Sequence, residues 1–204
     1  MQLVTQQQTH GDVIRDMDAE PAPLMSAEGK AILQGDGMMT ASAGRLLGVI
    51  TADCVPVLVV DTQNRAAAAF HAGWRGTVAS IVEQGIGRMR ERYGSQPGAL
   101  FAAIGPAIGR CCFEVGDDVK SKFLDTFSYT SELMEVGETA VHVDLPEANR
   151  RQLLDAGLRS EQITMIGECT ACARLPDGRR KYFSHRSERG FTGRMLSAIG
   201  ISAE

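Results

Sequence analysis

Short apolar runs alternate along this chain with segments in which apolar residues recur every three or four positions. The apolar runs predict strands at residues 46–50, 56–60, 66–71, 100–104, 163–167 and 182–184. The three-to-four spacing and its flanking signals predict helices at residues 76–93 and 116–127 and between Asp144 and Gly157. This alternation predicts an α/β fold, a single-domain layered sandwich with a mixed central sheet flanked by helices.

Local signals support several of these boundaries. Gly94 follows three arginines at the end of the first helix, where cations favour the helix dipole and glycine ends the helix. Asp144 is a predicted N-cap, with Pro146 in the first turn. Residues 46–50 and 56–60 are either two strands or one strand bent between them, because Pro56 cannot donate to a central ladder. Residues 18–29 predict a loop.

Composition narrows the class of protein. The chain has 204 residues, is 44% hydrophobic and carries a formal net charge of -4, which suits one domain and does not predict binding to nucleic acid or membranes. The N-terminus lacks the basic start and apolar core of a signal peptide, so we expect a cytoplasmic protein. Five cysteines, an odd number, argue against a disulfide framework and favour a reducing compartment.

Side chains that could act in catalysis or metal binding follow directly after two of the apolar runs. Thr-Ala-Asp-Cys occupies residues 51–54, and His-Ala-Gly-Trp-Arg-Gly occupies residues 71–76. Open α/β sheets bind their ligands at strand ends of this kind. Cys54 and His71 are therefore either a thiolate nucleophile and its base, with Asp53 in support, or two ligands of a metal. If the fold adds His10, the N, S and N donors leave one tetrahedral position open, as in a catalytic zinc site.

Two arginines are candidate anion-binding residues. Arg75 follows an indole and stands at a predicted helix N-terminus, where free backbone N–H groups favour a phosphate or carboxylate. Arg186 lies in a cationic segment, residues 179–194, that is interleaved with aromatic residues. This composition favours contact with a phosphate or nucleoside. It also fits single-stranded nucleic acid, although the acidic charge of the whole chain argues against that partner.

The remaining cysteines form weaker patterns. Cys169 and Cys172 make a single C-x-x-C, and no second such pair exists in the chain. Cys111 and Cys112 are adjacent, so we expect them not to complete a tetrahedral site with that pair. Reduced structural thiols are the favoured interpretation, with redox or structural zinc roles as alternatives.

Together these motifs resemble the bacterial polyphenol oxidase (laccase-domain) family, whose members are also described as purine nucleoside phosphorylases and peptidoglycan editing factors. The resemblance covers nearly the whole chain. It is carried by Gln-Thr-His-Gly at residues 8–11, Gly-Asp-Gly at 35–37, the segments 51–57 and 70–76, the glycine-rich loop 103–109, and the segments 113–116, 144–150, 183–186 and 193–195. The resemblance implies one laccase-like domain over residues 1–204 that lacks the family's usual N-terminal segment.

The resemblance also implies a site and an activity. The family's metal ligands correspond to His10, Cys54 and His71, which implies bound zinc. Family members look like purine nucleoside enzymes: transferases in the phosphorolysis of adenosine, inosine, guanosine and methylthioadenosine, and hydrolases in adenosine deamination. Purine nucleoside and phosphate are thus the implied partners. Older descriptions assign copper-dependent phenol oxidation, but the chain's four histidines are too few for the several copper sites of a laccase.

Three hypotheses follow from the sequence. The first is a zinc-dependent purine nucleoside enzyme. The second is a cysteine hydrolase or amidase that acts on a peptidoglycan precursor, with Cys54 as nucleophile. The third is a binding module without turnover. Bound metal separates the first from the second, because a thiolate bound to zinc is a poor nucleophile, and turnover separates both from the third.

Overall fold

A six-stranded mixed sheet forms the centre of the computed structural model, which describes residues 1–203. Its strands, in spatial order, are β11 (Ile163–Met165), β7 (Leu100–Ile104), β5 (Val55–Asp61), β6 (Ala66–Ala72), β3 (Gly37–Thr40) and β2 (Ile14–Asp16). The four inner strands pair antiparallel, whereas β11 pairs with β7, and β2 with β3, in parallel. The central strands are buried on both faces, which explains their continuous apolar runs.

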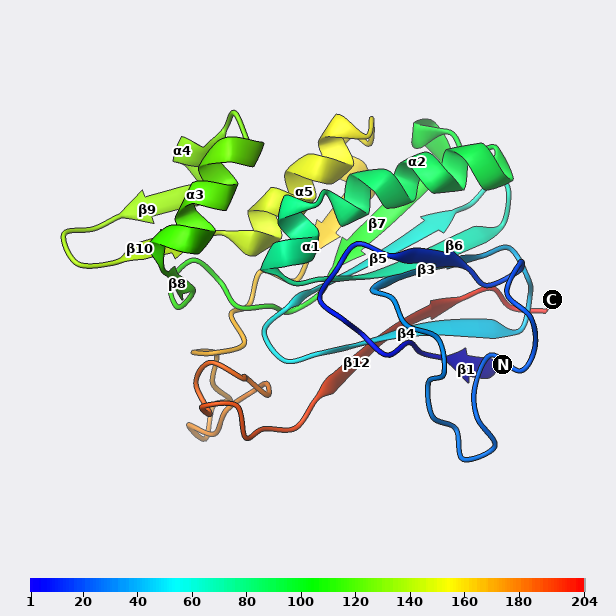
Figure 1. The fold of residues 1–204 in the computed structure, drawn as a ribbon, viewed down its shortest axis with the longest axis horizontal. Coiled ribbons are helices and arrows are strands. Elements are labelled where there is room, and N and C mark those ends of the chain that lie inside the picture. The colour runs from blue at the N-terminus through cyan, green and yellow to red at the C-terminus, as the bar shows by residue number, and fades with distance from the viewer. Residues whose placement is uncertain (204) are drawn as a thin grey trace.

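Helices cover one face of this sheet (Figure 1). They are α1 (Trp74–Val78), α2 (Ile81–Tyr93) and α5 (Leu145–Asp155). The fully buried ring of Phe70 on β6 packs beneath α2, where a side chain at Gly85 would begin only 2.2 Å from that ring. This close approach of helix and strand requires glycine at position 85.

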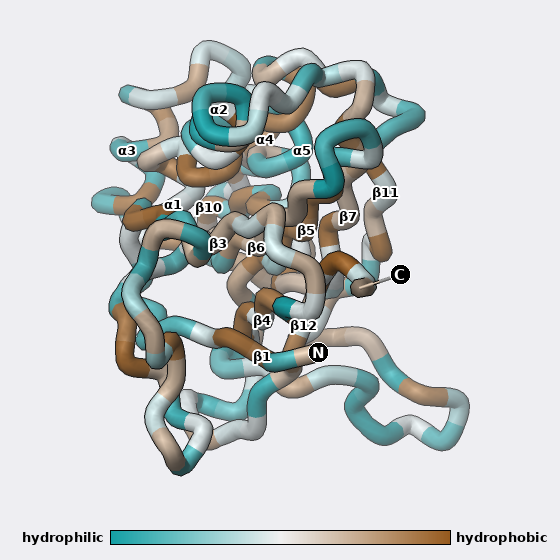
Figure 2. Tube along the Cα trace, turned by 90° about the vertical axis from the view of Figure 1, so that its right-hand side faces the viewer, coloured by the Kyte–Doolittle hydropathy of each residue, from teal (hydrophilic) through white to brown (hydrophobic). Residues whose placement is uncertain are grey.

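A second sheet covers the other face (Figure 2). It contains β1 (Gln2–Val4), β4 (Arg45–Thr51) and β12 (Met195–Gly200), in the order β1-β4-β12. Leu47 and Val49 of β4 belong to the same buried cluster as Met38 and Ala69 of the central sheet. The predicted α/β sandwich with a mixed central sheet is therefore confirmed, with its helices on one face and a small sheet on the other.

A smaller layer lies beside α5. It is built from α3 (Asp117–Thr126), α4 (Thr130–Leu133) and an antiparallel sheet of β8 (Glu114–Val115), β10 (Val141–Val143) and β9 (Met134–Val136). Two short 3-10 helices, η1 (Pro97–Ala99) and η2 (Ser160–Gln162), precede β7 and β11. No helix within residues 1–203 is both long enough and apolar enough to cross a bilayer.

The helix end predicted at Gly94 and the helix start predicted at Asp144 are confirmed. Gly94 ends α2 with a φ of 73°, and the Asp144 carboxylate accepts a hydrogen bond of 3.0 Å from the backbone N–H of Glu147 at the start of α5. The helix predicted from residue 76 to 93 is interrupted, because Ser80 adopts a φ of 56° and separates α1 from α2.

The structure decides between the two alternatives for residues 46–60 in favour of two strands, and it overturns one other strand prediction. Residues 46–50 and 56–60 are not one bent strand but parts of β4 and β5, which belong to different sheets. Pro56 is the second residue of β5 and stands before the pairing with β7 begins at Val57, near a strand end where proline is tolerated. The strand predicted at residues 182–184 is wrong, since residues 166–194, orange in Figure 1, contain no helix or extended strand.

Candidate metal centre and active site

Three segments meet at one edge of the central sheet. Strands β5 and β6 are antiparallel and pair Pro56 with His71, so Cys54, just before β5, lies at the same edge as His71. His10 comes from the loop that connects β1 and β2. The ligand atoms of His10, Cys54 and His71 all lie within 4.8 Å of one another. We call these three residues the cavity cluster.

Asp36 is the residue just before β3, between Gly35 and Gly37, and it contacts two members of this cluster. Its side chain is buried, and its Oδ1 accepts hydrogen bonds from His71 Nδ1 at 2.8 Å and from the His10 backbone N–H at 2.9 Å. Its Oδ2 accepts from the N–H of Gly11 at 2.9 Å and from the hydroxyl of Thr9 at 2.8 Å. Since Asp36 occupies Nδ1 of His71, Nε2 remains for a ligand.

Backbone conformation also sets the position of His10. Its φ is 60°, in the left-handed region that non-glycine residues seldom adopt. The two hydrogen bonds that Asp36 accepts from the backbone of residues 10 and 11 hold this conformation. The imidazole rings of His10 and His71 meet edge to face, with 4.9 Å between their centroids.

The charges in the cluster favour a thiolate beside an imidazolium. Burial opposes ionisation of Cys54, but the neighbouring imidazoles of His10 and His71 lower its pKa to about 7. Burial likewise opposes a charged His71, yet the Asp36 carboxylate and Cys54 raise its pKa to about 9. Burial by itself would raise the pKa of the Asp36 carboxyl. Hydrogen bonds from His71, Gly11 and Thr9 outweigh that effect and lower the pKa to about 2.

The cluster lies in the wall of a cavity of about 510 Å³, a size typical of small-molecule sites. The cavity is also lined by Trp74, Phe113, His185 and the three arginines Arg75, Arg186 and Arg194. A side chain at position 73 would begin 3.1 Å from Cys54 Sγ, so glycine there leaves the thiol accessible. Donors for a metal, aromatic faces and cations thus share one cavity.

The two predicted anion-binding arginines both reach this cavity. The Arg75 guanidinium is exposed and stacks on Trp74, 4.3 Å from the ring centroid. Arg186 lies 5.4 Å from the ring centroid of Phe113 and donates from Nη1 to the carbonyl of Glu114 at 2.9 Å. Helix α1, which follows the His71 motif, has only five residues, so Arg75 contributes more positive charge than the helix end does.

Asp53 does not have the position that sequence reasoning gave it. We expected it to support His71, but Asp36 is the carboxylate in contact with that imidazole. The Asp53 carboxylate instead accepts hydrogen bonds of 2.6 Å from the Thr170 hydroxyl and from the backbone N–H of Arg186. Asp53 therefore ties the irregular segment 166–194 to the sheet edge.

Asp36 and Arg194 are the site residues that sequence reasoning missed. The available signal for Asp36 was an acid flanked by Gly35 and Gly37 at the start of an apolar segment. A side chain on Gly37 would begin 2.7 Å from Ile14, which explains the glycine but not the partner of Asp36. The structure brings His10, Cys54, His71, Arg75 and Arg186 to one cavity, and their catalytic and ligand roles remain predictions.

Comparison with known proteins places this site in a family. The family model described as "Multi-copper polyphenol oxidoreductase laccase" matches residues 1–202. The chain is 40% identical over 171 residues to a protein of Geobacillus stearothermophilus named purine nucleoside phosphorylase YlmD. It is 35% identical over 194 residues to adenosine deaminase RL5 of an unknown prokaryotic organism.

Each match covers a larger share of this chain than of the relative, because the relatives are longer. The first match covers 83% of this chain but 61% of the relative, and the second covers 94% and 74%. The crystal structure of the Bacillus licheniformis hypothetical protein YfiH superimposes with a TM-score of 0.88 at 34% identity, over 98% of this chain and 74% of that one. The sequence match and the shared fold agree: this chain belongs to the multi-copper polyphenol oxidoreductase laccase family.

Proposed function

We propose that this protein is a zinc-dependent purine nucleoside enzyme that catalyses phosphorolysis of adenosine, inosine, guanosine and methylthioadenosine and deaminates adenosine. The observation that carries the proposal is one cavity that combines a three-donor metal cluster with three arginines. The names of two relatives, a purine nucleoside phosphorylase and an adenosine deaminase, support the same substrate class.

The donor set supports zinc as the metal. Two imidazoles and one thiolate are common zinc ligands, and three protein ligands are typical of catalytic rather than structural zinc. The Asp36 carboxylate behind His71 resembles the carboxylate–histidine arrangement that orients metal ligands. Bound zinc would supply a Lewis acid at this point of the cavity.

The other lining residues support a nucleoside beside an anion. The aromatic faces of Trp74 and Phe113 suit a flat purine base, and each lies next to an arginine, Arg75 or Arg186. Arginine binds phosphate through two parallel N–H donors, so these side chains are placed to hold the phosphate that attacks the sugar. In deamination the attack is at a different atom: water adds to C6 of the purine, and the amino group on that carbon leaves as ammonia.

A product assay on metal-analysed protein tests this proposal. With phosphate, adenosine should yield adenine and ribose 1-phosphate; without phosphate it should yield inosine and ammonia. Both activities should fall after treatment with a chelator and return when zinc is added. Absence of both products from zinc-loaded protein would overturn the proposal and leave the cysteine hydrolase and binding-module hypotheses.

The second candidate is a cysteine hydrolase or amidase acting on a peptidoglycan precursor. It is supported by the depressed pKa of Cys54 and the raised pKa of His71, which together favour a thiolate–imidazolium pair. In this case Asp36, not Asp53, orients the base. Metal-free protein that is fully active on such a substrate, and covalent trapping of Cys54, would favour this candidate.

Copper-dependent phenol oxidation has less support from the residues. Within residues 1–203, the groups able to hold a metal contain only two histidines, His10 and His71. A multi-copper oxidase relays electrons between several histidine-rich sites. A single copper ion bound to the cavity cluster in place of zinc remains testable by elemental analysis of the purified protein.

A further inference from the structure

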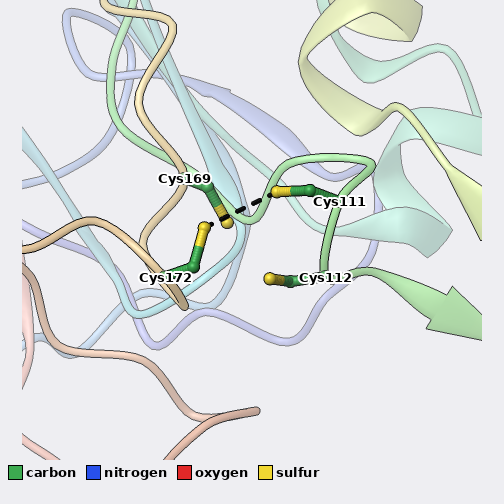
Figure 3. Close-up of side chains that lie close together, drawn as sticks. All are labelled: Cys111, Cys112, Cys169 and Cys172. Atoms are coloured by element: carbon green, nitrogen blue, oxygen red, sulfur yellow. Dashed lines mark hydrogen bonds between the residues drawn. The ribbon is translucent and has the colours of Figure 1, made fainter.

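The other four cysteines gather in a second cluster, Cys111, Cys112, Cys169 and Cys172 (Figure 3). Their sulfur atoms all lie within 4.8 Å of one another, and Cys111 Sγ is 3.6 Å from Cys172 Sγ. We expected the adjacent Cys111 and Cys112 not to complete a tetrahedral site with the C-x-x-C pair, but the structure brings all four sulfurs close enough together to hold one ion. We call these residues the four-cysteine cluster.

Two facing turns bring the sulfurs together. In one turn the backbone N–H groups of Cys112 and Phe113 both donate to the carbonyl of Gly109 at 3.0 Å, which lets both adjacent thiols face the same side. In the other, the N–H of Ala173 donates to the carbonyl of Cys169 at 2.9 Å. A backbone bridge between Ala107 and Cys169 fixes the two turns side by side.

The distances fit a single tetrahedral ion. Four thiolates about 2.3 Å from one zinc ion lie about 3.8 Å from each other. The sulfurs of Cys111 and Cys172 are close to that separation, and far from the roughly 2.05 Å of a disulfide bond. The other sulfur pairs lie within 4.8 Å, at most about 1 Å beyond that separation.

One backbone donor and two guanidinium groups lie beside the cluster. Zinc with four thiolates carries a net charge of -2. The backbone N–H of Gly109 donates to Cys169 Sγ at 3.2 Å. The guanidinium groups of Arg174 and Arg180 both donate to the carbonyl of Ala171, inside the turn that carries the C-x-x-C pair, at 3.4 and 3.2 Å. The N–H of Gly109 favours the thiolate form of Cys169, and the two guanidinium groups place positive charge beside the same turn without reaching a sulfur atom.

We propose that the four-cysteine cluster is a second, structural zinc site that is separate from the cavity cluster. Binding releases the thiol protons and forms four Zn–S bonds, with no change in oxidation state. Four protein ligands leave no position for a substrate, which is typical of structural zinc. This proposal does not depend on the proposed nucleoside activity.

The site would join two walls of the cavity. Cys111 and Cys112 precede Phe113, and Cys169 and Cys172 belong to the irregular segment 166–194 that also carries Arg186. Loops of this length without secondary structure are uncommon in compact domains and are usually functional or disordered. Zinc at the four-cysteine cluster would hold this segment against the sheet, together with the hydrogen bonds that Asp53 accepts from Thr170 and Arg186.

Counting the metal bound by the chain tests the proposal. Native mass spectrometry and elemental analysis of protein purified under reducing conditions should give two zinc ions per chain. The double variant Cys111→Ser/Cys172→Ser should lose one equivalent, and so should the matched control Cys54→Ala, which alters the only cysteine outside the cluster. A wild-type zinc content in the double variant would overturn the proposal.

Cobalt substitution identifies the ligands without relying on a variant that folds poorly. Wild-type protein loaded with two Co²⁺ ions should show the intense sulfur-to-metal charge transfer of a four-thiolate site, and Cys54→Ala should retain that band. A band that disappears in Cys54→Ala would overturn the proposal. Stoichiometric iron, or a Cys111–Cys172 disulfide found by peptide mapping without reduction, would equally overturn it.

Proteolysis tests the structural role. Chelation of wild-type protein should speed tryptic cleavage at least tenfold after the basic residues of segment 174–181, because two facing turns would no longer be joined. Adding zinc should restore resistance, also in Cys54→Ala, whose cavity cluster lacks a ligand. Unchanged cleavage after the metal has been removed from the four-cysteine cluster would contradict the structural role.

Discussion

The cavity cluster and the four-cysteine cluster both bring together side chains able to bind a metal from distant segments of the chain. They differ in the number and kind of their donor atoms. The cavity cluster offers three donors of two kinds, has a buried carboxylate behind it and faces a cavity of about 510 Å³. The four-cysteine cluster offers four sulfurs, one of which accepts from a backbone N–H, and no imidazole. An incomplete ligand set beside a cavity favours chemistry, and a complete one favours stability.

Asp53 connects these two regions. It precedes Cys54 of the cavity cluster, while its carboxylate accepts from Thr170, which lies between the cysteines of the C-x-x-C pair. Its carbonyl also accepts from the N–H of Ile108, at 2.9 Å. A φ of 89° turns the backbone so that both contacts form. The difference between the clusters therefore predicts separable effects on turnover and stability.

The largest expected effect on turnover is that of Cys54→Ala. This change removes a metal ligand and little volume, so nucleoside turnover should fall by more than the ~10–100-fold typical of losing a residue behind a ligand. The thermal unfolding midpoint should change little. Product assays and calorimetry on the same preparation measure both. If metal-free wild-type protein were fully active while Cys54→Ala was inactive, Cys54 would be a nucleophile instead.

Asp36→Asn should have the next largest effect. The amide keeps the shape but weakens the hydrogen bond to His71 and loses the negative charge, so zinc affinity and turnover should each fall ~10–100-fold. Competition with a chromophoric chelator measures the affinity. The matched change Asp53→Asn should leave zinc affinity at the cavity cluster within about threefold of wild type while it loosens segment 166–194. Equal zinc affinities in both variants and wild type would remove Asp36 from its proposed role.

Arg75→Lys and Arg186→Lys should act on one reaction more than the other. Lysine keeps the charge but loses the paired donors, so the KM for phosphate should rise about tenfold, the equivalent of one charge-assisted hydrogen bond. Deamination, which needs no phosphate, should change less. Equal losses in both reactions would mean that these arginines hold the nucleoside or the fold.

Cys111→Ser/Cys172→Ser should show the reverse of the Cys54→Ala pattern. Turnover by the folded fraction at low temperature should stay within about threefold of wild type, because the cavity cluster keeps its ligands. The unfolding midpoint should fall by about 2–4 °C for each kcal/mol of lost stability. A stable but inactive variant would break the distinction between the two clusters.

The smallest expected effect is that of low pH on the free energy of unfolding, through the Asp36 carboxyl. Its folded-state pKa of about 2 lies below the ~3.9 of an unfolded chain, so its contribution is complete above about pH 4 and is lost as pH falls toward 2. Metal-free Asp36→Asn should accordingly lose less stability than metal-free wild type between pH 4 and pH 2. Urea unfolding at a series of pH values measures this, and parallel curves would contradict it.

Sequence determined the parts of this protein that depend on near neighbours. Gly94 ends a helix because its own φ is positive, and Asp144 begins one because its acceptor lies three residues from the donor. The apolar runs at β5, β6 and β7 indicated buried strands because each run must be buried whatever lies next to it. The motifs at residues 8–11, 51–54 and 71–76 likewise predicted which side chains would share a site.

Only the tertiary structure decided which distant groups are in contact. His71 binds the carboxylate of Asp36 rather than that of Asp53 because β3 lies beside β6, a pairing that no local pattern encodes. Cys111 and Cys112 join Cys169 and Cys172 because the bridge at Ala107 aligns two turns. Side-chain types and spacings fix what chemistry is available, whereas strand order and loop packing fix which partners lie within bonding distance.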